Sequence, residues 1–477
     1  MRSISWQALI ILVLASIGSA KTLTSLAHPH VDWVSFPVIQ PASDKEQAED
    51  SLAPTPPMGW NSWDSFGTTV TEADVKENAA WMAEHLKPYG WQYVVVDMEW
   101  FVTNPAPEGN SKNSQYSIDA FGWYVPDVKR FPSSANSAGF KPLADYVHSL
   151  GLKFGIHILR GIPKEAVEIN LPISGSSLRV GDGADRSDTC PWNSDNYGAD
   201  PSKPAAQAYY DSIAQLYAGW GVDFIKADCI ASRPYKGEDI RRLSLALRKT
   251  GRPIVLSLSP GEAPVEKIEE LREYSQMWRI SDDVWDLWHS PVAYPQGVLD
   301  QFPRIEKWAK VGRPGHWPDA DMLPLGYLGP RPGWGGKART SRLTHEEQRS
   351  LFTLWCMFRS PLMIGGNLPR SDLWTVALLT NPEVLAIDRE SVGNREVVAT
   401  PDIVVWLAET ADGKGSYLEV FNRGEKREIL HYQWKDLGLS DHNYKARDLW
   451  QRRDLGLAPS LSVQLPRHDC ILYRLES

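Results

Sequence analysis

Residues 221–230, Gly221-Val222-Asp223-Phe224-Ile225-Lys226-Ala227-Asp228-Cys229-Ile230, form an apolar run that carries two charged residues near its end. Side chains of a β-strand alternate between two faces, so Lys226 and Asp228 would emerge together on one face. Two charges on an inward face are costly unless they lie at the carboxyl end of a strand, where α/β folds place their active sites. The segment is therefore typical of either a structural ion pair or a functional carboxylate.

The whole chain has the composition of an ordinary globular protein. Its 477 residues are 42% hydrophobic and 23% charged, which suits one large domain with a smaller one. The net charge of −9 argues against nucleic acid and anionic surfaces as partners. Tryptophan occurs 21 times. Aromatic rings stack on the apolar faces of sugars, although many of these residues are expected in the core.

The N-terminus predicts export. Arg2, the apolar run 8–17 and the small residues 18–20 have the pattern of a signal peptide over residues 1–20, cleaved after Ala20. No later stretch is apolar over the roughly 20 residues that a membrane-spanning helix needs. We therefore expect a soluble protein, secreted or periplasmic, with no membrane partner. Residues 21–53 show no periodicity and predict a leader or linker.

The four cysteines, Cys190, Cys229, Cys356 and Cys470, are too few and too scattered for a disulfide framework or a zinc site. Cys356 falls in an apolar helical pattern, which indicates burial. Cys190 and Cys229 could pair near the site, but sequence does not decide connectivity.

Strand and helix patterns alternate eight times over residues 54–390, which is the count of a (β/α)₈ TIM barrel. The predicted strands are 56–63, 91–97, 153–157, 221–228, 254–258, 277–281, 315–319 and 362–364. The predicted helices are 71–86, 142–150, 204–220, 239–249, 265–274, 299–310, 344–358 and 370–379. The last segment, 391–477, has short alternating runs at 403–407, 416–421, 429–434, 461–465 and 470–475. These runs predict a C-terminal antiparallel β-sandwich domain.

Acidic residues gather where the predicted barrel strands end. They are Asp97, Glu99, Asp228, Asp282, Asp283, Asp319 and Asp321. A retaining glycosidase needs one ionised and one protonated carboxyl group about 5–5.5 Å apart. Asp228 and Asp283 lie at the ends of two strands that are next-but-one neighbours, so they would face each other across the barrel mouth. The positive charge of Lys226 would hold Asp228 ionised. The negative charges of the acids around Asp283 would raise the pKa of Asp283. Such a cluster could instead hold a divalent cation.

Five segments together resemble a known family. They are Met58-Gly59-Trp60-Asn61-Ser62-Trp63, Tyr93-Val94-Val95-Val96-Asp97, Phe224-Ile225-Lys226-Ala227-Asp228-Cys229, Trp278-Arg279-Ile280-Ser281-Asp282-Asp283 and Asp319-Ala320-Asp321-Met322-Leu323. Over residues 54–475 they resemble, in order, the motifs of glycoside hydrolase family 27, the α-galactosidase and α-N-acetylgalactosaminidase family. The resemblance implies a barrel with a C-terminal β-sandwich and double displacement with retention, without metal or other cofactor.

The resemblance also implies residue roles. Asp228 matches the catalytic nucleophile and Asp283 the acid/base. Arg279 matches the arginine at the sugar's 2-position, and Lys226 the sugar-binding lysine. The further positions that match the substrate pocket are Trp63, Asp97, Asp321 and Met322, with His157 where the family often has a tyrosine.

Three departures from the family pattern affect the predicted substrate. Met98 stands where the family's galactosidases have a second aspartate that holds the sugar's O4 and O6. Strand alternation would put Glu99 on the face of Asp97, so Glu99 could supply the missing carboxylate from a different place. The segment 259–262 is smaller than its family counterpart beside the 2-position. The residues 158–163 lack the family's cysteine near strand three.

We therefore predict a secreted retaining exo-glycosidase, an α-galactosidase acting on terminal α-D-galactosyl residues. The alternatives are a β-L-arabinopyranosidase, because that sugar lacks the O6 carbon, and an α-N-acetylgalactosaminidase, because the 2-position is open. A catalytically silent sugar-binding protein is a third reading, which the presence of both Asp228 and Asp283 disfavours. The linkage, the aglycone and the oligomeric state are not readable from the sequence.

Overall fold

The structure is a computed structural model that describes residues 52–106, 108–109 and 113–477. The predicted signal peptide 1–20 and residues 21–51 of the predicted leader lie outside the described residues. Those described belong to one unit of the chain, Asp44–Ser477. None of the helices in these ranges has both the length and the apolar character that spanning a bilayer would require.

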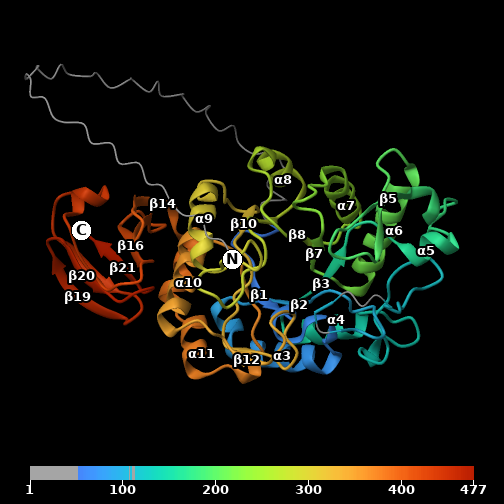
Figure 1. Ribbon diagram of the computed structural model, residues 1–477, viewed down its shortest axis with the longest axis horizontal. Coiled ribbons are helices and arrows are strands. Elements are labelled where there is room, and N and C mark those ends of the chain that lie inside the picture. Colours follow the sequence, from blue (N-terminus) through green and yellow to red (C-terminus); the bar gives the residue numbers. More distant parts are fainter. Residues whose placement is uncertain (1–51, 107, 110–112) are drawn as a thin grey trace, which may run out of the picture. The chain divides into compact units, whose positions relative to one another are not determined.

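Eight parallel strands form the central sheet (Figure 1). They are β1 (Met58–Asn61), β2 (Tyr93–Val96), β3 (Lys153–Leu159), β7 (Phe224–Asp228), β8 (Val255–Leu258), β9 (Met277–Arg279), β10 (Trp317–Asp319) and β13 (Leu362–Ile364). Their order is β10-β9-β8-β7-β3-β2-β1-β13. Leu323 joins the two outer strands, because its N–H donates to the Met363 carbonyl at 2.8 Å and its carbonyl accepts from the Gly365 N–H at 3.0 Å. The predicted barrel is therefore confirmed.

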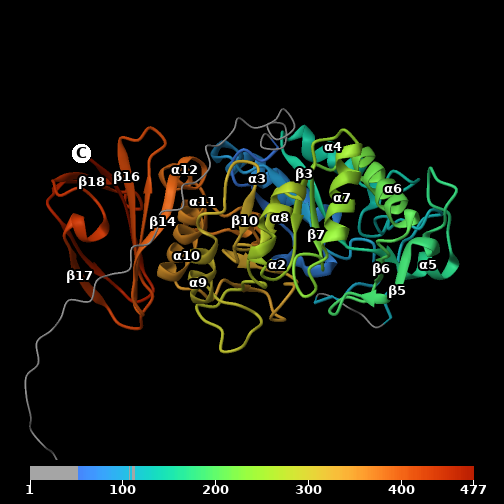
Figure 2. The same cartoon turned by 90° about the horizontal axis from the view of Figure 1, so that it is seen from above.

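Helices surround this sheet (Figure 2). They are α3 (Glu72–His85), α4 (Lys141–Ser149), α6 (Pro204–Trp220), α7 (Gly237–Lys249), α8 (Ile268–Tyr274), α9 (Phe302–Trp308), α10 (His345–Phe358), α11 (Leu373–Leu379) and α12 (Pro382–Glu390). Thr71 and Thr344 cap α3 and α10, since each side chain accepts a hydrogen bond from a backbone N–H of the first turn. Gly221 ends α6 at φ +84°, a conformation that glycine adopts without strain. Of these helices, α12 was not predicted.

Large side chains fill the interior of the barrel beneath the strand ends. This inner cluster contains Tyr93, Val95, Phe224, Val255, Met277, Trp317, Met322 and Met363, all less than a tenth exposed. Gly59 of β1 allows this packing, because a Cβ there would lie 2.4 Å from the Tyr93 carbonyl oxygen. The barrel is thus a packed core that supports residues at its carboxyl end.

Additional short elements lie between the barrel units. They are α2 (Trp63–Phe66), β4 (Ile162–Pro163), α5 (Lys164–Ile169), β5 (Ala184–Thr189), β6 (Asn196–Ala199), β11 (Tyr327–Leu328) and β12 (Arg339–Thr340). The 3₁₀ turns among them are η1 (Gly67–Thr69), η2 (Lys87–Tyr89), η3 (Pro132–Ser134), η4 (Val180–Gly183), η5 (Val265–Lys267), η6 (Leu299–Gln301) and η7 (Leu368–Arg370). A further 3₁₀ turn, η8 (Trp434–Leu437), lies in the C-terminal domain. The sheet β4-β6-β5 is an insertion after β3, and the pair β11-β12 follows β10. Both insertions begin at the carboxyl ends of barrel strands.

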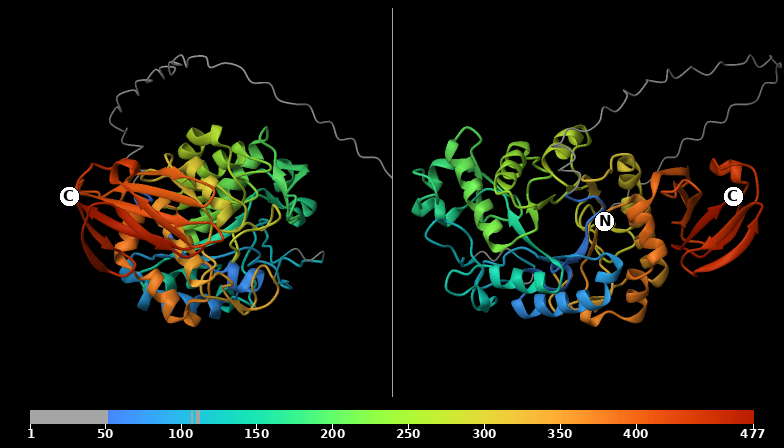
Figure 3. Two further views of the ribbon diagram at one scale, coloured as in Figure 1. Left: turned by 60° about the vertical axis from the view of Figure 1, so that its left-hand side comes forward. Right: turned by 180° about the vertical axis from the view of Figure 1, so that it is seen from behind.

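The C-terminal strands form an antiparallel β-sandwich, as predicted (Figure 3). They are β14 (Val392–Ala399), β15 (Ile403–Glu409), β16 (Gly415–Asn422), β17 (Glu428–Tyr432), β18 (Tyr444–Asp448), β19 (Arg453–Ala458), β20 (Leu461–Leu465) and β21 (Cys470–Glu476). One sheet has the order β14-β15-β16-β21-β18-β19, and β17 pairs with β20 in the other. The strands β14, β18 and β19 were not predicted.

The turn before β21 connects the sandwich to the barrel. The His468 ring stacks on Trp288, which lies in the segment after β9, with ring centroids 4.2 Å apart. The two His468 ring nitrogens lie 2.7 Å from Glu347 of α10 and 3.1 Å from Glu425. Arg349 of α10 forms an ion pair with Asp469. Polar and aromatic contacts therefore fix this turn against a segment that leads to the barrel mouth.

Candidate active site

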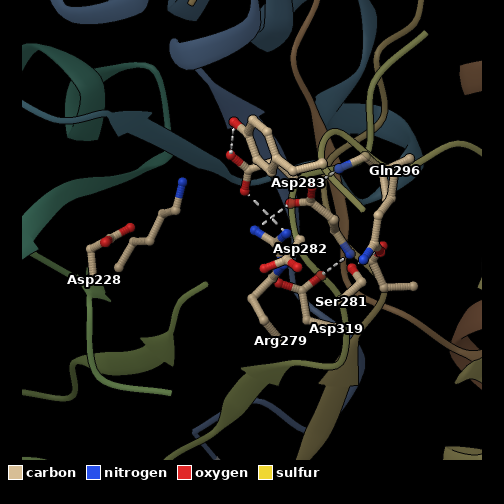
Figure 4. Close-up of polar contacts among 12 residues, drawn as sticks. Asp228, Arg279, Ser281, Asp282, Asp283, Gln296 and Asp319 are labelled. Carbon is tan, nitrogen blue, oxygen red and sulfur yellow. Dashed lines mark hydrogen bonds and ion pairs between the residues drawn. The ribbon is translucent and has the colours of Figure 1, made fainter. Parts of the chain in front are cut away.

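A cavity of about 600 Å³ opens at the carboxyl ends of the barrel strands. It is lined by Trp63, Asp97, Met98, Glu108, Pro191, Trp192, Lys226, Asp228, Ser232, Arg233, Pro260, Asp282, Asp283, Ala293 and Tyr294. The predicted residues Trp63, Asp97, Lys226, Asp228 and Asp283 thus share one cavity. In Figure 4, Asp228 lies opposite Asp283 and Arg279.

Asp228 ends β7 and is 8% exposed. Its Oδ1 accepts a hydrogen bond from Trp192 Nε1 at 3.0 Å, and its Oδ2 lies 3.2 Å from His157 Nε2. Burial alone would raise the pKa of Asp228, but His157, Lys226 and Trp192 outweigh burial and lower that pKa below its ordinary value. Asp228 is therefore an ionised carboxylate at neutral pH, which is the state that a nucleophile needs.

Lys226 contacts Asp97 more closely than it contacts Asp228. Its Nζ lies 2.9 Å from Asp97 Oδ2, which also accepts a hydrogen bond from Asn61 Nδ2 at 2.7 Å. Burial would raise the pKa of Asp97, but the charges of Lys226 and His157 lower it strongly. Burial would lower the pKa of Lys226, but Asp97 and Asp228 raise it. The cavity floor therefore holds a charged lysine between two carboxylates.

Asp283 follows β9, with 27% of its side chain exposed. Its Oδ1 lies 3.3 Å from Arg279 Nη2, and its Oδ2 accepts a hydrogen bond from the Tyr294 hydroxyl at 3.2 Å. Arg279 Nη1 also lies 2.7 Å from Asp321 Oδ1. The neighbouring Asp282 forms an ion pair with Arg233 instead. Asp283 is thus the member of the Asp282-Asp283 pair that the site arginine contacts.

Asp319 and Asp321 of this cluster both have raised pKa values. Burial raises the pKa of Asp321 to about 7, with a further contribution from the charges of Asp283 and Asp319, while Arg279 opposes the rise. Asp321 Oδ2 accepts a hydrogen bond from the Val284 N–H at 2.6 Å. The acidic crowd predicted around Asp283 therefore exists, and it contributes to the raised pKa of Asp321.

Four predicted pocket residues, Arg279 among them, lie behind the cavity wall. Asp321 and Met322 line a smaller recess of about 20 Å³ with Asn61 and Arg279. His157 is 2% exposed and reaches the site through Asp228. His157 contacts Asp228 and Arg279 contacts Asp283, so these two residues support carboxyl groups on the wall of the main cavity.

Glu99 does not share the face of Asp97. Strand β2 ends at Val96, and Glu99 adopts φ +63°, so the alternation that placed it there does not extend this far. Glu99 is 2% exposed, and its Oε1 accepts a hydrogen bond from Asn193 Nδ2 at 3.3 Å. Among the described residues of this turn, Asp97 and Met98 reach the cavity wall. A thioether therefore occupies the wall where a second carboxylate was expected.

Cys190 and Cys229 form a disulfide, which the sequence had left open. Cys190 follows β5, so the insertion after β3 supplies the partner that residues 158–163 lack. The disulfide joins the residue after Asp228 to the segment that carries Trp192. Sequence reasoning missed both Trp192 and Tyr294, although the position of Trp192 two residues after a cysteine was a usable signal. Within the described ranges, no three His, Cys, Asp or Glu side chains are arranged to hold a metal ion.

Comparisons with known proteins agree with this site. The family described as "Alpha galactosidase A" matches residues 199–390, and the "Alpha galactosidase C-terminal beta sandwich domain" matches residues 400–475. An alpha-galactosidase of Cyamopsis tetragonoloba is 30% identical over 434 residues, 90% of this chain and 88% of the relative. An alpha-N-acetylgalactosaminidase of Gallus gallus is 28% identical, covering 79% of this chain and 77% of its own.

A solved structure is more similar still. The family 27 β-L-arabinopyranosidase of Geobacillus stearothermophilus is 48% identical, with a TM-score of 0.86, over 90% of this chain and 98% of its own. A TIM barrel with a β-sandwich and paired acids at its strand ends, together with these relatives, defines a glycoside hydrolase. The chain belongs to glycoside hydrolase family 27, the α-galactosidase family, as its motifs predicted.

Proposed function

We propose that the protein is a retaining exo-glycosidase that removes terminal α-D-galactosyl residues and the configurationally matched β-L-arabinopyranosyl residues. The observation that carries the proposal is the pair of carboxyl groups in one cavity. Asp228 is held ionised by His157, Lys226 and Trp192, and Asp283 lies opposite it beside Arg279. Double displacement requires a carboxylate nucleophile and a second carboxyl group across the same site, and these two residues supply that arrangement.

In the first step, an Asp228 carboxylate oxygen attacks the anomeric carbon while Asp283 gives its proton to the glycosidic oxygen. The bond between the anomeric carbon and that oxygen breaks, the leaving group departs as an alcohol, and a glycosyl ester of Asp228 forms. In the second step, Asp283 takes a proton from water, and the water oxygen attacks the anomeric carbon. The ester bond breaks, and the sugar leaves with its original configuration.

Several observations bear on which of three sugars is the better substrate. The curated α-galactosidases match most of the chain at about 30% identity, which supports the galactoside. Met98 on the cavity wall favours the arabinopyranoside, because that sugar lacks the hydroxymethyl group that a second carboxylate would hold. The 48% identity to a β-L-arabinopyranosidase agrees with this second candidate. An α-N-acetylgalactosaminide is a third candidate, supported by the small residues 259–261 and by the avian relative.

A panel of 4-nitrophenyl glycosides tests the proposal. We expect measurable kcat/KM for α-D-galactoside and β-L-arabinopyranoside, with the arabinopyranoside equal or better, and little activity on glucosides. Proton NMR of the first-formed sugar should show retained anomeric configuration. Turnover of neither sugar, or an inverted first product, would contradict the proposal.

We further propose that the mature protein is exported after cleavage at Ala20. The residues concerned lie outside those described, so the support comes from the signal pattern of residues 1–20 and from the Cys190–Cys229 disulfide, since disulfides persist in oxidising compartments. N-terminal sequencing of the protein recovered from the source cells' medium or periplasm should start at Lys21. A full-length protein retained in the cytoplasm would refute export.

A further inference from the structure

Tyr294 stands at the cavity wall, on the loop that also carries Asp283. Its hydroxyl donates to Asp283 Oδ2 at 3.2 Å, and half of its surface remains exposed. No motif of the sequence singled it out. The two steps of the proposed mechanism give no role to this hydrogen bond between a half-exposed tyrosine and the acid/base candidate.

The backbone of the loop fixes Tyr294 relative to Asp283. The Gln296 N–H donates to the Asp283 carbonyl at 2.9 Å, and the Trp285 N–H donates to the Gln296 carbonyl at 3.0 Å. These bonds pair the two ends of the loop, two residues beyond Tyr294. Asp286 anchors the same loop, because it is buried and accepts from Arg339 at 2.8 Å and from Arg342 at 2.9 Å. We call residues 283–296 the braced loop, because these contacts fix its two ends, and they hold Tyr294 close to Asp283.

Several charged groups act on Asp283. Arg279 of β9 contacts Oδ1, and Asp321 after β10 shares that arginine. Lys226 of β7 and Asp64 of α2 are further charged neighbours that interact with Asp283 through space. Arginine and lysine only donate hydrogen bonds, whereas a hydroxyl can both donate and accept. Tyr294 is thus the described neighbour that can stay bonded to Oδ2 in both the protonated and the ionised form.

On the basis of the proposed function, we propose that Tyr294 is a positioning residue for the acid/base. Its hydroxyl holds the Asp283 carboxyl in one orientation and, by donating to the ionised form, favours the state in which Asp283 activates water. Partial burial and the Asp283 charge raise the pKa of Tyr294, so the hydroxyl keeps its proton across the working pH range.

The test compares Tyr294→Phe with wild type by the pH dependence of kcat/KM. The donated hydrogen bond favours the ionised carboxylate over the protonated acid, so we expect its loss to move the alkaline limb of kcat/KM about 0.5–1 pH unit higher, with KM little changed. The substrates are 4-nitrophenyl and 2,4-dinitrophenyl glycosides of the preferred sugar. Turnover of the dinitrophenyl substrate should change less, because its leaving group needs little protonation.

Tyr210→Phe is the matched control. The Tyr210 hydroxyl donates to the Asp239 carboxylate at 2.9 Å, between α6 and α7 and away from the cavity. This variant should lower Tm but leave the alkaline limb in place. An unmoved limb in Tyr294→Phe, or an equal movement in Tyr210→Phe, would overturn the inference.

A third variant separates this inference from the proposed function. Asp283→Ala should lose activity on the 4-nitrophenyl substrate, and azide should restore turnover of the 2,4-dinitrophenyl substrate, because it attacks the anomeric carbon of the glycosyl ester in place of water and needs no base; the ester bond to Asp228 breaks and a glycosyl azide leaves. If Asp283→Ala behaves in this way and Tyr294→Phe does not move the limb, the role of Tyr294 alone is refuted. If Asp283→Ala keeps wild-type activity, the role of Asp283 in the proposed function fails.

Discussion

Replacing Met98 with aspartate tests what the altered cavity wall does to substrate choice. Met98 lines the cavity next to Asp97, and its N–H donates to Asp97 Oδ1 at 2.8 Å. A hydrogen bond to a charged group contributes roughly 1.5–3 kcal/mol. A second carboxylate beside Asp97 also costs some repulsion, because Lys226 is already paired with Asp97. We therefore expect the lower end of that range, about 1.5 kcal/mol, which corresponds to roughly a tenfold change in kcat/KM.

The assay is kcat/KM of Met98→Asp for 4-nitrophenyl α-D-galactoside and for 4-nitrophenyl β-L-arabinopyranoside. The galactoside value should rise about tenfold while the arabinopyranoside value stays level or falls, since only galactose has the O6 group to bind. Met98→Leu, which keeps an apolar wall, is the matched control and should leave the ratio of the two unchanged. Equal effects of Met98→Asp on both sugars would show that position 98 does not sense O6, and would refute the reasoning.

Three further predictions follow from the site. Asp228→Gly should abolish hydrolysis, and azide or formate should restore turnover by acting as an external nucleophile. Asp282→Asn should keep most activity. An inactive Asp282→Asn would show that the acid/base role had been assigned to the wrong residue of the Asp282-Asp283 pair. Trp192→Phe removes a donor that helps to lower the pKa of Asp228, so the acidic limb of kcat/KM should move to higher pH, and an unmoved limb would contradict the role of the indole. Asp97→Asn should cost about 3–5 kcal/mol in urea unfolding at pH 7, because it leaves Lys226 buried without its partner. Since the pKa of Asp97 is lowered in the folded state, its contribution is present above about pH 4 and lost as pH falls, so the difference between Asp97→Asn and wild type should narrow in acid.

Local patterns predicted most of the barrel, because its strands and helices bury periodic apolar faces. Helix α6 was predicted at its observed bounds, Pro204–Trp220. The strands β14 and β19 were missed because they lie at the edges of their sheet and expose much of their length, so their residues show little alternation. Helix α12 was missed because it follows α11 after only two residues.

The site was predictable where it lies on strands. Asp228 and Lys226 are on β7, and Asp283 follows β9 closely, so strand geometry and motif order placed them in one cavity. Trp192 and Tyr294 lie on long segments without periodicity, where contacts distant in sequence decide the position of each side chain. Glu99 shows the same limit, because a residue at positive φ breaks the alternation three residues beyond the strand.

The stacking of His468 on Trp288 makes the β-sandwich part of the active-site scaffold. Trp288 belongs to the braced loop that starts at Asp283, and the sandwich turn covers its ring. The turn is itself tied to α10, since Ser350 Oγ donates to the His468 carbonyl at 2.7 Å. In a chain shortened to the barrel alone, water would replace the imidazole on that ring, and the loop would lose its outer support. Replacing this sandwich with that of another family member would therefore also replace the side chain that packs on Trp288 of the braced loop.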